Sequence, residues 1–389
     1  MGLVGPGFVG AHHVDAVRRL GNVDVVGVAA SSAPSARAAA DRLGIPRAYG
    51  DYDALVADPD VHVVHVATPN YLHAPVVKAA LRRRKHVVCD KPLALSCREA
   101  EELLIAARDA GVVHAVTFNY RGNPMVQEAR TLVARGELGS AHFVHGAYLQ
   151  DWLIEASDFS WRLELEKGGE SSAIADIGSH WFDLVEHVVG TRIASVCADV
   201  ATVVTTRIRP EANAQSFPGH AKPGGTAVDV QSEDLAAVLL RFENGARGVV
   251  SVGQVCAGHK NDCWFEVNGS LGSLRWAQER QNDLWVGRRH GANEVRTKDP
   301  ATLDAETRRY VHLPGGHQQG WSDAFHFVMR DIYSAIRAAP GAHDRVPAPA
   351  LATFEDGHRA ACLVDAVLGS ARGGGRWTPV AGARVGVQQ

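Results

Sequence analysis

Three residues in this chain have types that suit the oxidation of an alcohol. Lys91 stands in an Asp-Lys-Pro sequence directly after the apolar run 86–89, and Asp176 and His180 are four positions apart. On a helix, that spacing puts the carboxylate and the imidazole on one face. A histidine accepts a hydroxyl proton near neutral pH, an acid orients it, and an ammonium stabilises alkoxide charge. A buried structural pair explains the Asp-x-x-x-His spacing about as well.

The first residues predict a dinucleotide-binding loop. Gly5, Gly7 and Gly10 fit the pattern G-x-G-x-x-G between a short apolar run and a helical stretch over residues 11–20. In such a loop the first glycine permits a tight turn, the second lets the backbone approach a pyrophosphate, and the third allows close helix packing. The N-terminus of the following helix faces the phosphates. Together with Lys91, the loop predicts a nicotinamide-dependent oxidoreductase.

The residues after the second expected strand leave the choice of nicotinamide cofactor open. In such domains an acidic residue about 20 positions after the glycine loop usually binds the ribose of the cofactor. This acid is absent here. Ser31 and Ser32 lie in its place, and Arg37 is the nearby cation that would meet a 2′-phosphate. The sequence favours NAD without excluding NADP.

A polar segment after the apolar run 61–67 predicts a further part of the cofactor site. It contains Thr68, Pro69, Asn70 and His73. The carboxyl end of a parallel strand is where ligands bind in such sheets. A helix start capped by Asn70 is the alternative.

The composition limits the class of partner. The 389 residues contain 40 Lys and Arg against 43 Asp and Glu, for a net charge of −3. Such a chain has no global basic field for nucleic acid and no apolar run of membrane-spanning length, so a small-molecule partner fits better. The six cysteines form no C-x-x-C pair and, without a recognisable signal peptide, predict reduced thiols in a cytoplasmic protein. No metal is expected, because neither His12 and His13 nor His142 and His145 fit a zinc pattern.

The order of apolar patterns predicts an α/β protein with two domains. Over residues 1–120, short apolar strands alternate with helical stretches, which indicates βαβ units and a Rossmann-type, doubly wound parallel sheet. Over residues 121–389 consecutive strands favour an antiparallel or mixed sheet. The Asn-Gly pair at 244–245 predicts a hairpin, and the Pro- and Gly-rich stretch 208–228 predicts a surface loop or lid.

Three motifs, in order, resemble the glucose-fructose oxidoreductase and inositol dehydrogenase family (Gfo/Idh/MocA). They are GPGFVGAHH from Gly5, CDKP from Cys89 and ADIGSHWFDL from Ala175. The resemblance implies a Rossmann domain, then an α+β domain whose large open, mostly antiparallel sheet forms homodimers or homotetramers. It also implies NAD(P)-dependent, reversible oxidation of a secondary hydroxyl of a sugar, glycoside, amino sugar or cyclitol, with C3 as one expected position. The family's glutamate before Lys-Pro is Asp90 here, which is one methylene shorter.

The same resemblance implies roles for individual residues. Lys91 hydrogen-bonds the reacting hydroxyl, Asp176 binds a neighbouring hydroxyl or the lysine, and His180 is the general base. The implied cofactor contacts are Gly5, Gly7, Phe8, Val9, Gly10, Ser31, Ser32, Thr68, Pro69, Asn70, His73, Asp90, Lys91, Asn119, Trp161 and Arg162. By likeness to the glycoside dehydrogenase branch of the family, the implied sugar contacts are Tyr148, Gln150, Asp151 and His317.

One other substrate and two other functions stay open. Acidic residues cluster between positions 151 and 170, which would suit an amino sugar such as an aminoglycoside, although a solvated loop explains them better. A redox-assisted glycosidase would hold its cofactor tightly and release no net NADH. A nucleotide-binding sensor without catalysis is the third alternative, and the presence of Lys91, Asp176 and His180 argues against it.

Overall fold

The chain divides into two units that are each built from two segments. The computed structural model describes residues 1–211, 225–338 and 348–383. The segments are Met1–Gly122 and Trp321–Ala361 for the first unit, and Asn123–Gly320 and Cys362–Gln389 for the second. The sequence-based expectation is a single division after residue 120, whereas the chain here returns to the first unit at Trp321.

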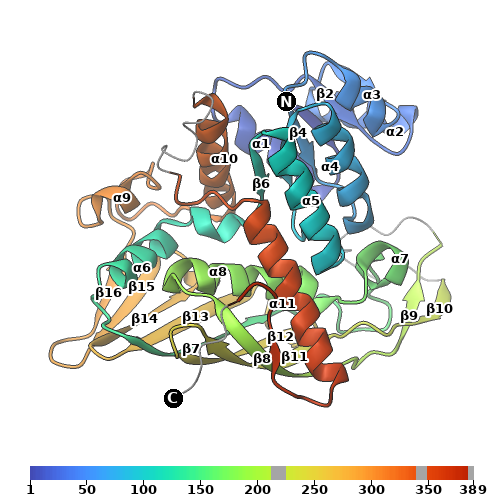
Figure 1. The fold of residues 1–389 in the computed structure, drawn as a ribbon. Helices are drawn as coiled ribbons and strands as arrows, with labels where there is room; N and C mark the ends of the chain where they lie inside the picture. The colour runs from blue at the N-terminus through green and yellow to red at the C-terminus, as the bar shows by residue number, and fades with distance from the viewer. Residues whose placement is uncertain (212–224, 339–347, 384–389) are drawn as a thin grey trace. The chain divides into compact units, whose positions relative to one another are not determined.

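The first unit contains a parallel sheet of six strands, as the alternating pattern predicts (Figure 1). In pairing order the strands are β3 (Arg47–Tyr49), β2 (Gly27–Ala29), β1 (Gly2–Val4), β4 (Val63–Val66), β5 (His86–Cys89) and β6 (His114–Val116). The order reverses direction after β1, and parallel sheets of this kind bind ligands at the carboxyl ends of the strands beside such a reversal. The glycine loop follows β1, and Lys91 follows β5, so both lie at this edge.

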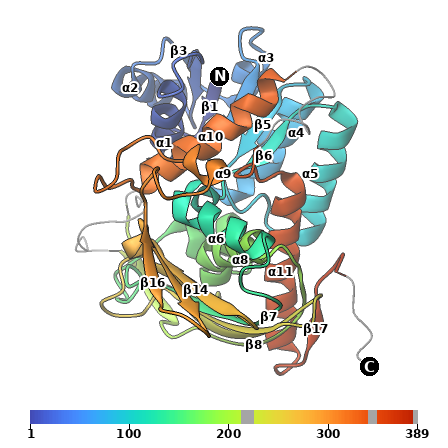
Figure 2. The ribbon, with the colours of Figure 1, turned by 90° about the vertical axis from the view of Figure 1, so that its left-hand side faces the viewer.

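Helices cover the parallel sheet on both faces. They are α1 (Phe8–Arg18), α2 (Ala33–Leu43), α3 (Tyr52–Ala57), α4 (His73–Arg82), α5 (Cys97–Ala110) and α10 (Trp321–Arg337). Helix α4 packs against β4, β5 and α5, and α1 packs against α10 (Figure 2). The pattern Ser96-x-x-Glu99 is a capping box, which predicts the start of a helix. The Ser96 hydroxyl accepts a hydrogen bond from the Glu99 amide, which confirms this start for α5.

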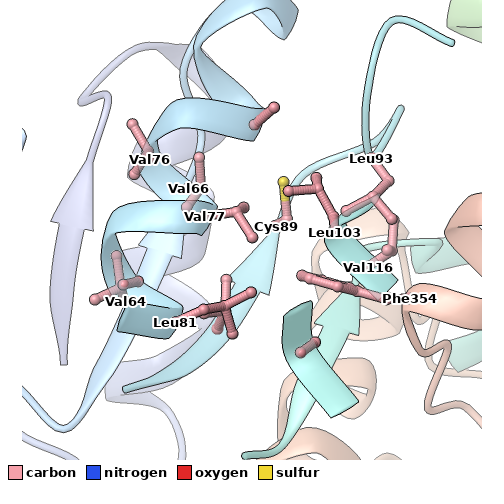
Figure 3. Packing of buried hydrophobic residues seen from close by; sticks show 14 of the residues in the cluster. Val64, Val66, Val76, Val77, Leu81, Cys89, Leu93, Leu103, Val116 and Phe354 are labelled. Carbon is pink, nitrogen blue, oxygen red and sulfur yellow. The ribbon is translucent and has the colours of Figure 1, made fainter. Parts of the chain in front are cut away.

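The core of the first unit lies between β4, β5 and the helices α4 and α5. Figure 3 shows Val64 and Val66 of β4 beside Val77 of α4, with Leu103 of α5 beside Cys89 of β5. All five side chains are buried. Both faces of the sheet are covered, so its strands are continuous apolar runs without alternation.

A buried histidine pair lies on the other face of the same sheet. His13 of α1 and His65 of β4 are fully buried, and their Nδ1 atoms are 2.9 Å apart. His65 Nε2 lies 2.9 Å from the hydroxyl of Tyr333 on α10. Burial lowers the pKa of His13 to about 4 and the pKa of His65 well below its ordinary value. Both rings are therefore neutral in the folded protein near pH 7.

We expect this pair to make the protein sensitive to mild acid. In the unfolded chain a histidine takes up a proton near pH 6.5, whereas folded His13 does so only near pH 4. The stability that depends on a neutral His13 is therefore fully present above pH 6.5, and it is lost as the pH drops towards 4. The free energy of unfolding should fall by at least about 2 kcal/mol between pH 7 and pH 5. Urea unfolding at the two pH values measures it.

Two variants separate this effect from general acid destabilisation. His13→Gln should show a smaller fall between the two pH values, because the buried ring is gone. The exposed His62, just before β4, provides the control, and His62→Gln should keep the full fall. An equal fall in all three proteins would contradict the assignment.

The second unit contains a sheet of nine strands, as the run of consecutive strands predicts. In pairing order they are β16 (Glu294–Thr297), β15 (Asp283–Arg288), β14 (Gly272–Ala277), β13 (Asp262–Gly269), β7 (Ala141–Leu149), β12 (Arg247–Gly253), β11 (Leu235–Phe242), β8 (Ile193–Ala201) and β17 (Thr378–Pro379). Strands β7 and β12 pair in parallel, and the remaining pairs are antiparallel. The hairpin at residues 244–245 is confirmed, and Gly245 has a φ of +90°.

Helices α6 (Pro124–Ala134) and α8 (Ser179–Val189) lie on one face of the sheet (Figure 2). The unit also contains the short helices α7 (Leu165–Gly168) and α9 (Ala305–Arg308), while α11 (Phe354–Arg372) begins in the first unit and ends in the second. Helix α8 packs on β7 and β13, and α6 packs on β14 and β15. The described helices include none that is both long and apolar enough to cross a membrane.

Part of the stretch 208–228 forms strands, which corrects the expectation of a loop or lid throughout. Its two ends belong to the antiparallel strands β9 (Thr206–Arg209) and β10 (Thr226–Asp229). The remainder of the expected lid, residues 212–224, lies outside the described residues.

Two cysteines contradict the expectation of reduced thiols. Cys97 and Cys362 are disulfide-bonded, so the expectation is wrong for them. The free cysteines are Cys89, Cys197, Cys256 and Cys263. Burial raises the pKa of the Cys89 and Cys263 thiols well above its ordinary value, so both behave as small apolar core groups.

Candidate functional site: a nucleotide edge and a carboxylate network

The glycine loop has the geometry of a pyrophosphate cradle. Gly5 has a φ of +93°, and a Cβ there would lie 2.5 Å from the carbonyl oxygen of Ala67. A Cβ on Gly10 would lie 2.1 Å from the carbonyl oxygen of Gly5. At Gly7 a Cβ would meet no described heavy atom within 4 Å. The first and third glycines are thus required by the fold, whereas the second faces open space at the start of α1.

We expect two alanine substitutions to separate folding from cofactor binding. Gly7→Ala should change the free energy of unfolding by less than about 1 kcal/mol, because its space is open and its φ of −70° is ordinary. The methyl group should nevertheless weaken NADH binding at least about tenfold by keeping the pyrophosphate from the backbone. Gly10→Ala should cost about 1–3 kcal/mol of stability. NADH fluorescence titration and thermal unfolding measure the two effects, and unchanged NADH affinity in Gly7→Ala would place the pyrophosphate elsewhere.

The residues near the second strand suit NAD better than NADP. The Ser32 hydroxyl caps α2 by accepting from the Ser35 amide. Arg37, the cation that would meet a 2′-phosphate, pairs with Asp41 at 2.6 Å. Arg42 donates to the carbonyl of Pro6 in the glycine loop. Arg37 and Arg42 thus both have protein partners.

Two buried polar atoms at the same edge fit a bound dinucleotide. The Thr68 hydroxyl and the Asn119 amide nitrogen are buried and have no hydrogen-bond partner among the described residues. Buried polar groups normally have partners, so these atoms fit a ligand that supplies them. Asn70 is also buried, in the short helix Asn70–Leu72, but α4 is capped at Leu72, so the alternative role of Asn70 as its cap is wrong.

His73 joins the two segments that flank this edge. Its Nδ1 lies 2.7 Å from the carbonyl oxygen of Pro92, and its Nε2 lies 2.9 Å from that of Thr68. Burial lowers the pKa of His73, while Asp90 and the two carbonyls act in the opposite direction. The Asp90 carboxylate accepts from the Thr117 hydroxyl at 2.6 Å. The segment that carries Lys91 is thus held from both sides.

In the second unit, an irregular helix presents the predicted acid and histidine. Asp176 lies in the π-helix Ile174–Gly178, which continues directly into α8, and His180 is the second residue of α8. The sequence predicts one continuous helix here, and the wider turn was not foreseen. Single π turns occur frequently at functional sites. Both residues lie in the second unit, whereas Lys91 lies in the first.

Two of the described donors hold the Asp176 carboxylate. Arg162 Nε lies 3.2 Å from Oδ1, and the Gln254 side-chain amide donates to Oδ2 at 2.9 Å. The Arg162 guanidinium stacks over the ring of Trp161 at 4.6 Å, and Trp161 begins the short helix Trp161–Leu163. Arg162, expected from the resemblance to contact the cofactor, contacts the acid in this structure.

A chain of amides extends from Asp176 to two of the predicted sugar residues. Gln150 Oε1 accepts from the Trp152 indole at 2.8 Å, and Gln150 Nε2 donates to Asn261 Oδ1 at 3.0 Å. The Tyr148 hydroxyl donates to the same Asn261 oxygen at 2.7 Å. Gln254 and Asn261 were missed from the sequence, although their positions just after β12 and just before β13 are strand ends at one edge.

The other two predicted sugar residues lie outside this network of described contacts. Asp151 pairs with Lys260 at 2.6 Å, and this contact holds the pKa of Asp151 below its ordinary value. His317 is exposed, with its ring 3.4 Å from the carbonyl of Gly315. The structure joins Tyr148, Gln150, Asp176 and Arg162, but not Asp151 or His317, to one network.

Comparison with known proteins gives the class of the protein. Residues 1–118 match the model of the oxidoreductase family with an NAD-binding Rossmann fold, and residues 126–275 match the GFO/IDH/MocA C-terminal domain. The chain therefore belongs to the Gfo/Idh/MocA family of oxidoreductases. It is an enzyme whose first unit is an NAD-binding Rossmann domain, which agrees with the cradle and the buried polar atoms.

Individual relatives cover nearly the whole chain. Levoglucosan dehydrogenase of Pseudarthrobacter phenanthrenivorans is 32% identical over an alignment of 387 residues that covers 95% of each chain. An oxidoreductase domain protein from Kribbella flavida is 31% identical with a TM-score of 0.85, covering 97% of this chain and 98% of that one. A levoglucosan dehydrogenase solved with NADH and levoglucosan is 28% identical with a TM-score of 0.84, covering 98% of both chains.

Proposed function

We propose that this enzyme reversibly oxidises a secondary hydroxyl of a neutral sugar or glycoside to a ketone, with NAD as hydride acceptor. The first unit binds the cofactor and the second binds the sugar. The observation that carries the proposal is the Asp176 carboxylate held by Arg162 and Gln254 beside the Tyr148 and Gln150 network. Such a row of amides and a carboxylate suits the adjacent hydroxyl groups of a sugar ring. The whole-length similarity to levoglucosan dehydrogenase supports this class of substrate and C3 as the oxidised carbon.

The proposed roles follow from the chemistry of hydride removal. When bound, NAD takes the hydride from the carbinol carbon. His180 accepts the hydroxyl proton, the Lys91 ammonium stabilises the developing alkoxide, and Asp176 binds an adjacent hydroxyl. A hydroxyl donates to a carboxylate more strongly than to a neutral acceptor, so an ionised Asp176 orients the ring.

A neutral sugar fits better than an amino sugar. Three of the clustered acids already face cations: Asp151 pairs with Lys260, Glu164 with Lys167, and Glu170 with Arg372. A substrate ammonium would have to compete with these partners. The acidic segment therefore behaves as a solvated surface with internal pairs.

The first experiment is the ultraviolet absorbance of newly formed NADH. Purified protein would receive NAD or NADP with levoglucosan, neutral glycosides, cyclitols and amino sugars in separate reactions. We expect turnover of a neutral sugar or glycoside with NAD. Release of an aglycone without net NADH would instead assign the redox-assisted glycosidase, and cofactor binding with neither product would assign the sensor.

We also propose that the enzyme forms homodimers or homotetramers through the outer face of its nine-stranded sheet. Cross-strand neighbours on that face include Leu239, Val249, His145, Glu266, Arg275, Trp285 and Val295. Leu239 is 48% exposed and Val295 54%, whereas the adjacent Val250 and Phe265, on the opposite face, are fully buried. Exposed apolar residues on a sheet face are typical of subunit contacts. Light scattering on the eluted protein measures the mass, and a monomer would exclude the proposal.

A further inference from the structure

Gln254 is a fully buried amide that contacts the Asp176 carboxylate directly. It follows the last residue of β12, and its backbone amide donates to the carbonyl of Asp234 at 2.9 Å. Its side-chain nitrogen also lies 3.5 Å from Gln150 Oε1. One amide therefore connects the predicted catalytic acid to a predicted sugar contact.

The surroundings of Gln254 determine which way its amide points. The Ser172 hydroxyl lies 3.5 Å from Oε1, whereas Nε2 faces the Asp176 carboxylate and the Gln150 carbonyl. In the flipped orientation an oxygen would face two acceptors at once. An amide nitrogen donates two hydrogens and an amide oxygen donates none, so only the observed orientation satisfies these groups.

A second buried group fixes the start of the helix that carries Asp176. Glu233 Oε1 accepts from the Ser171 hydroxyl at 2.7 Å, from the Ser172 amide at 3.0 Å and from the Ile174 amide at 2.9 Å. Asp176 donates its own backbone amide to the carbonyl of Ser172. The backbone of Asp176 is thus held by Ser172, and its carboxylate is held by Gln254.

We propose that Gln254 is a positioning residue that holds the Asp176 carboxylate in its ionised form and in the orientation that binds the substrate. The inference rests on the proposed function, because it assigns Asp176 the task of binding a sugar hydroxyl. A hydrogen bond from a neutral amide stabilises the carboxylate without adding charge. Among the described contacts of the second unit, the charged groups near Asp176 include Arg162 across from it, Glu233 at the start of its helix, and His180 one turn later when protonated.

The test compares Gln254→Glu and Gln254→Met with the unaltered enzyme. Gln254→Glu has the same shape but puts a second carboxylate against Asp176, so the two groups share one proton at neutral pH. We expect kcat/KM for levoglucosan, or for whichever sugar the enzyme oxidises, to fall at least tenfold. The acid limb of its pH profile should move up by at least one unit, while KM for NAD stays the same. Gln254→Met should lower kcat/KM with a smaller shift of the acid limb.

A matched control is available in Gln127. This glutamine of α6 is also buried and contacts the ring of His187 at 3.2 Å. Gln127→Glu introduces a buried carboxylate of the same size into the same unit, so it measures the general cost of that change. We expect it to leave the pH limb where it is. An equal shift in both variants would overturn the proposal.

A readout without turnover separates this inference from the proposed function. The carbon-13 shift of the Asp176 carboxyl, assigned by its loss in Asp176→Asn, can be followed against pH in each protein. We expect Asp176 to titrate at higher pH in Gln254→Glu and Gln254→Met than in the unaltered chain. The same titration in all three would overturn the role of Gln254, whereas a shift without sugar oxidation would reject the proposed function alone.

Discussion

Replacing Lys91 by methionine is expected to lower kcat by about 10³-fold, which is the size of effect that a proton-transfer or alkoxide-stabilising group supplies. Lys91 follows β5 at the carboxyl edge of the parallel sheet, and His73 and Asp90 hold the segment around it. Methionine keeps the length of the side chain and removes the ammonium. NADH binding, measured by fluorescence, should change far less than kcat, because the main loss concerns the reacting hydroxyl and the cofactor keeps its other predicted contacts.

Lys85 provides the control for this substitution. It directly precedes the same strand, at the opposite edge of the sheet, and its ammonium donates to the carbonyl of Asp58. Lys85→Met removes the same charge and should leave kcat within about twofold, since the residue is remote from the carboxyl edge. If Lys91→Met kept the activity of the unaltered enzyme, the proposed mechanism would be wrong.

Replacing Arg207 by methionine is expected to lower the free energy of unfolding by about 3–5 kcal/mol, because it leaves the buried Asp234 carboxylate without its counter-charge. The two side chains are 0% and 1% exposed, with Arg207 Nη2 2.9 Å from Asp234 Oδ1. Arg207 Nη1 also donates to the carbonyls of Glu155 and Asp158 at 3.1 and 3.0 Å. The same substitution should therefore release the segment that follows the Gln150 and Trp152 contacts.

Arg209 lies two residues further along the same strand and is exposed. Arg209→Met should change stability by less than about 0.5 kcal/mol, as is usual for surface positions. Urea unfolding of the three proteins gives the comparison. Equal stabilities for Arg207→Met and Arg209→Met would show that the buried pair contributes little.

Local signals account for the elements that were predicted correctly. The glycine loop is defined by residues within six positions of one another, and the start of α5 by Ser96 and Glu99. The hairpin at residues 244–245 depends on the positive φ of Gly245. In each case the physical cause is a backbone preference or a contact between near neighbours, so the sequence contains it.

Elements that depend on distant partners were less predictable. The apolar pattern over residues 23–30 predicts a strand of that length. Only Gly27–Ala29 pairs with β1 and β3, because the ends of a strand depend on its neighbours. The parallel pairing of β7 with β12 joins segments about a hundred residues apart and has no signature in either. The π turn at Ile174–Gly178 forms where Glu233 binds the start of the helix.

By itself, the sequence determined the class of this protein: a glycine loop for NAD, a lysine after a buried strand, and an acid and a histidine four positions apart. It did not indicate what holds the acid. Gln254 is 78 positions from Asp176, and Asn261 is 111 positions from Gln150. These contacts arise only when the strands of the second unit assemble, because a side-chain amide has no local preference that announces its partner. The tertiary structure therefore decided which residues contact the carboxylate of Asp176, the proposed substrate-binding acid.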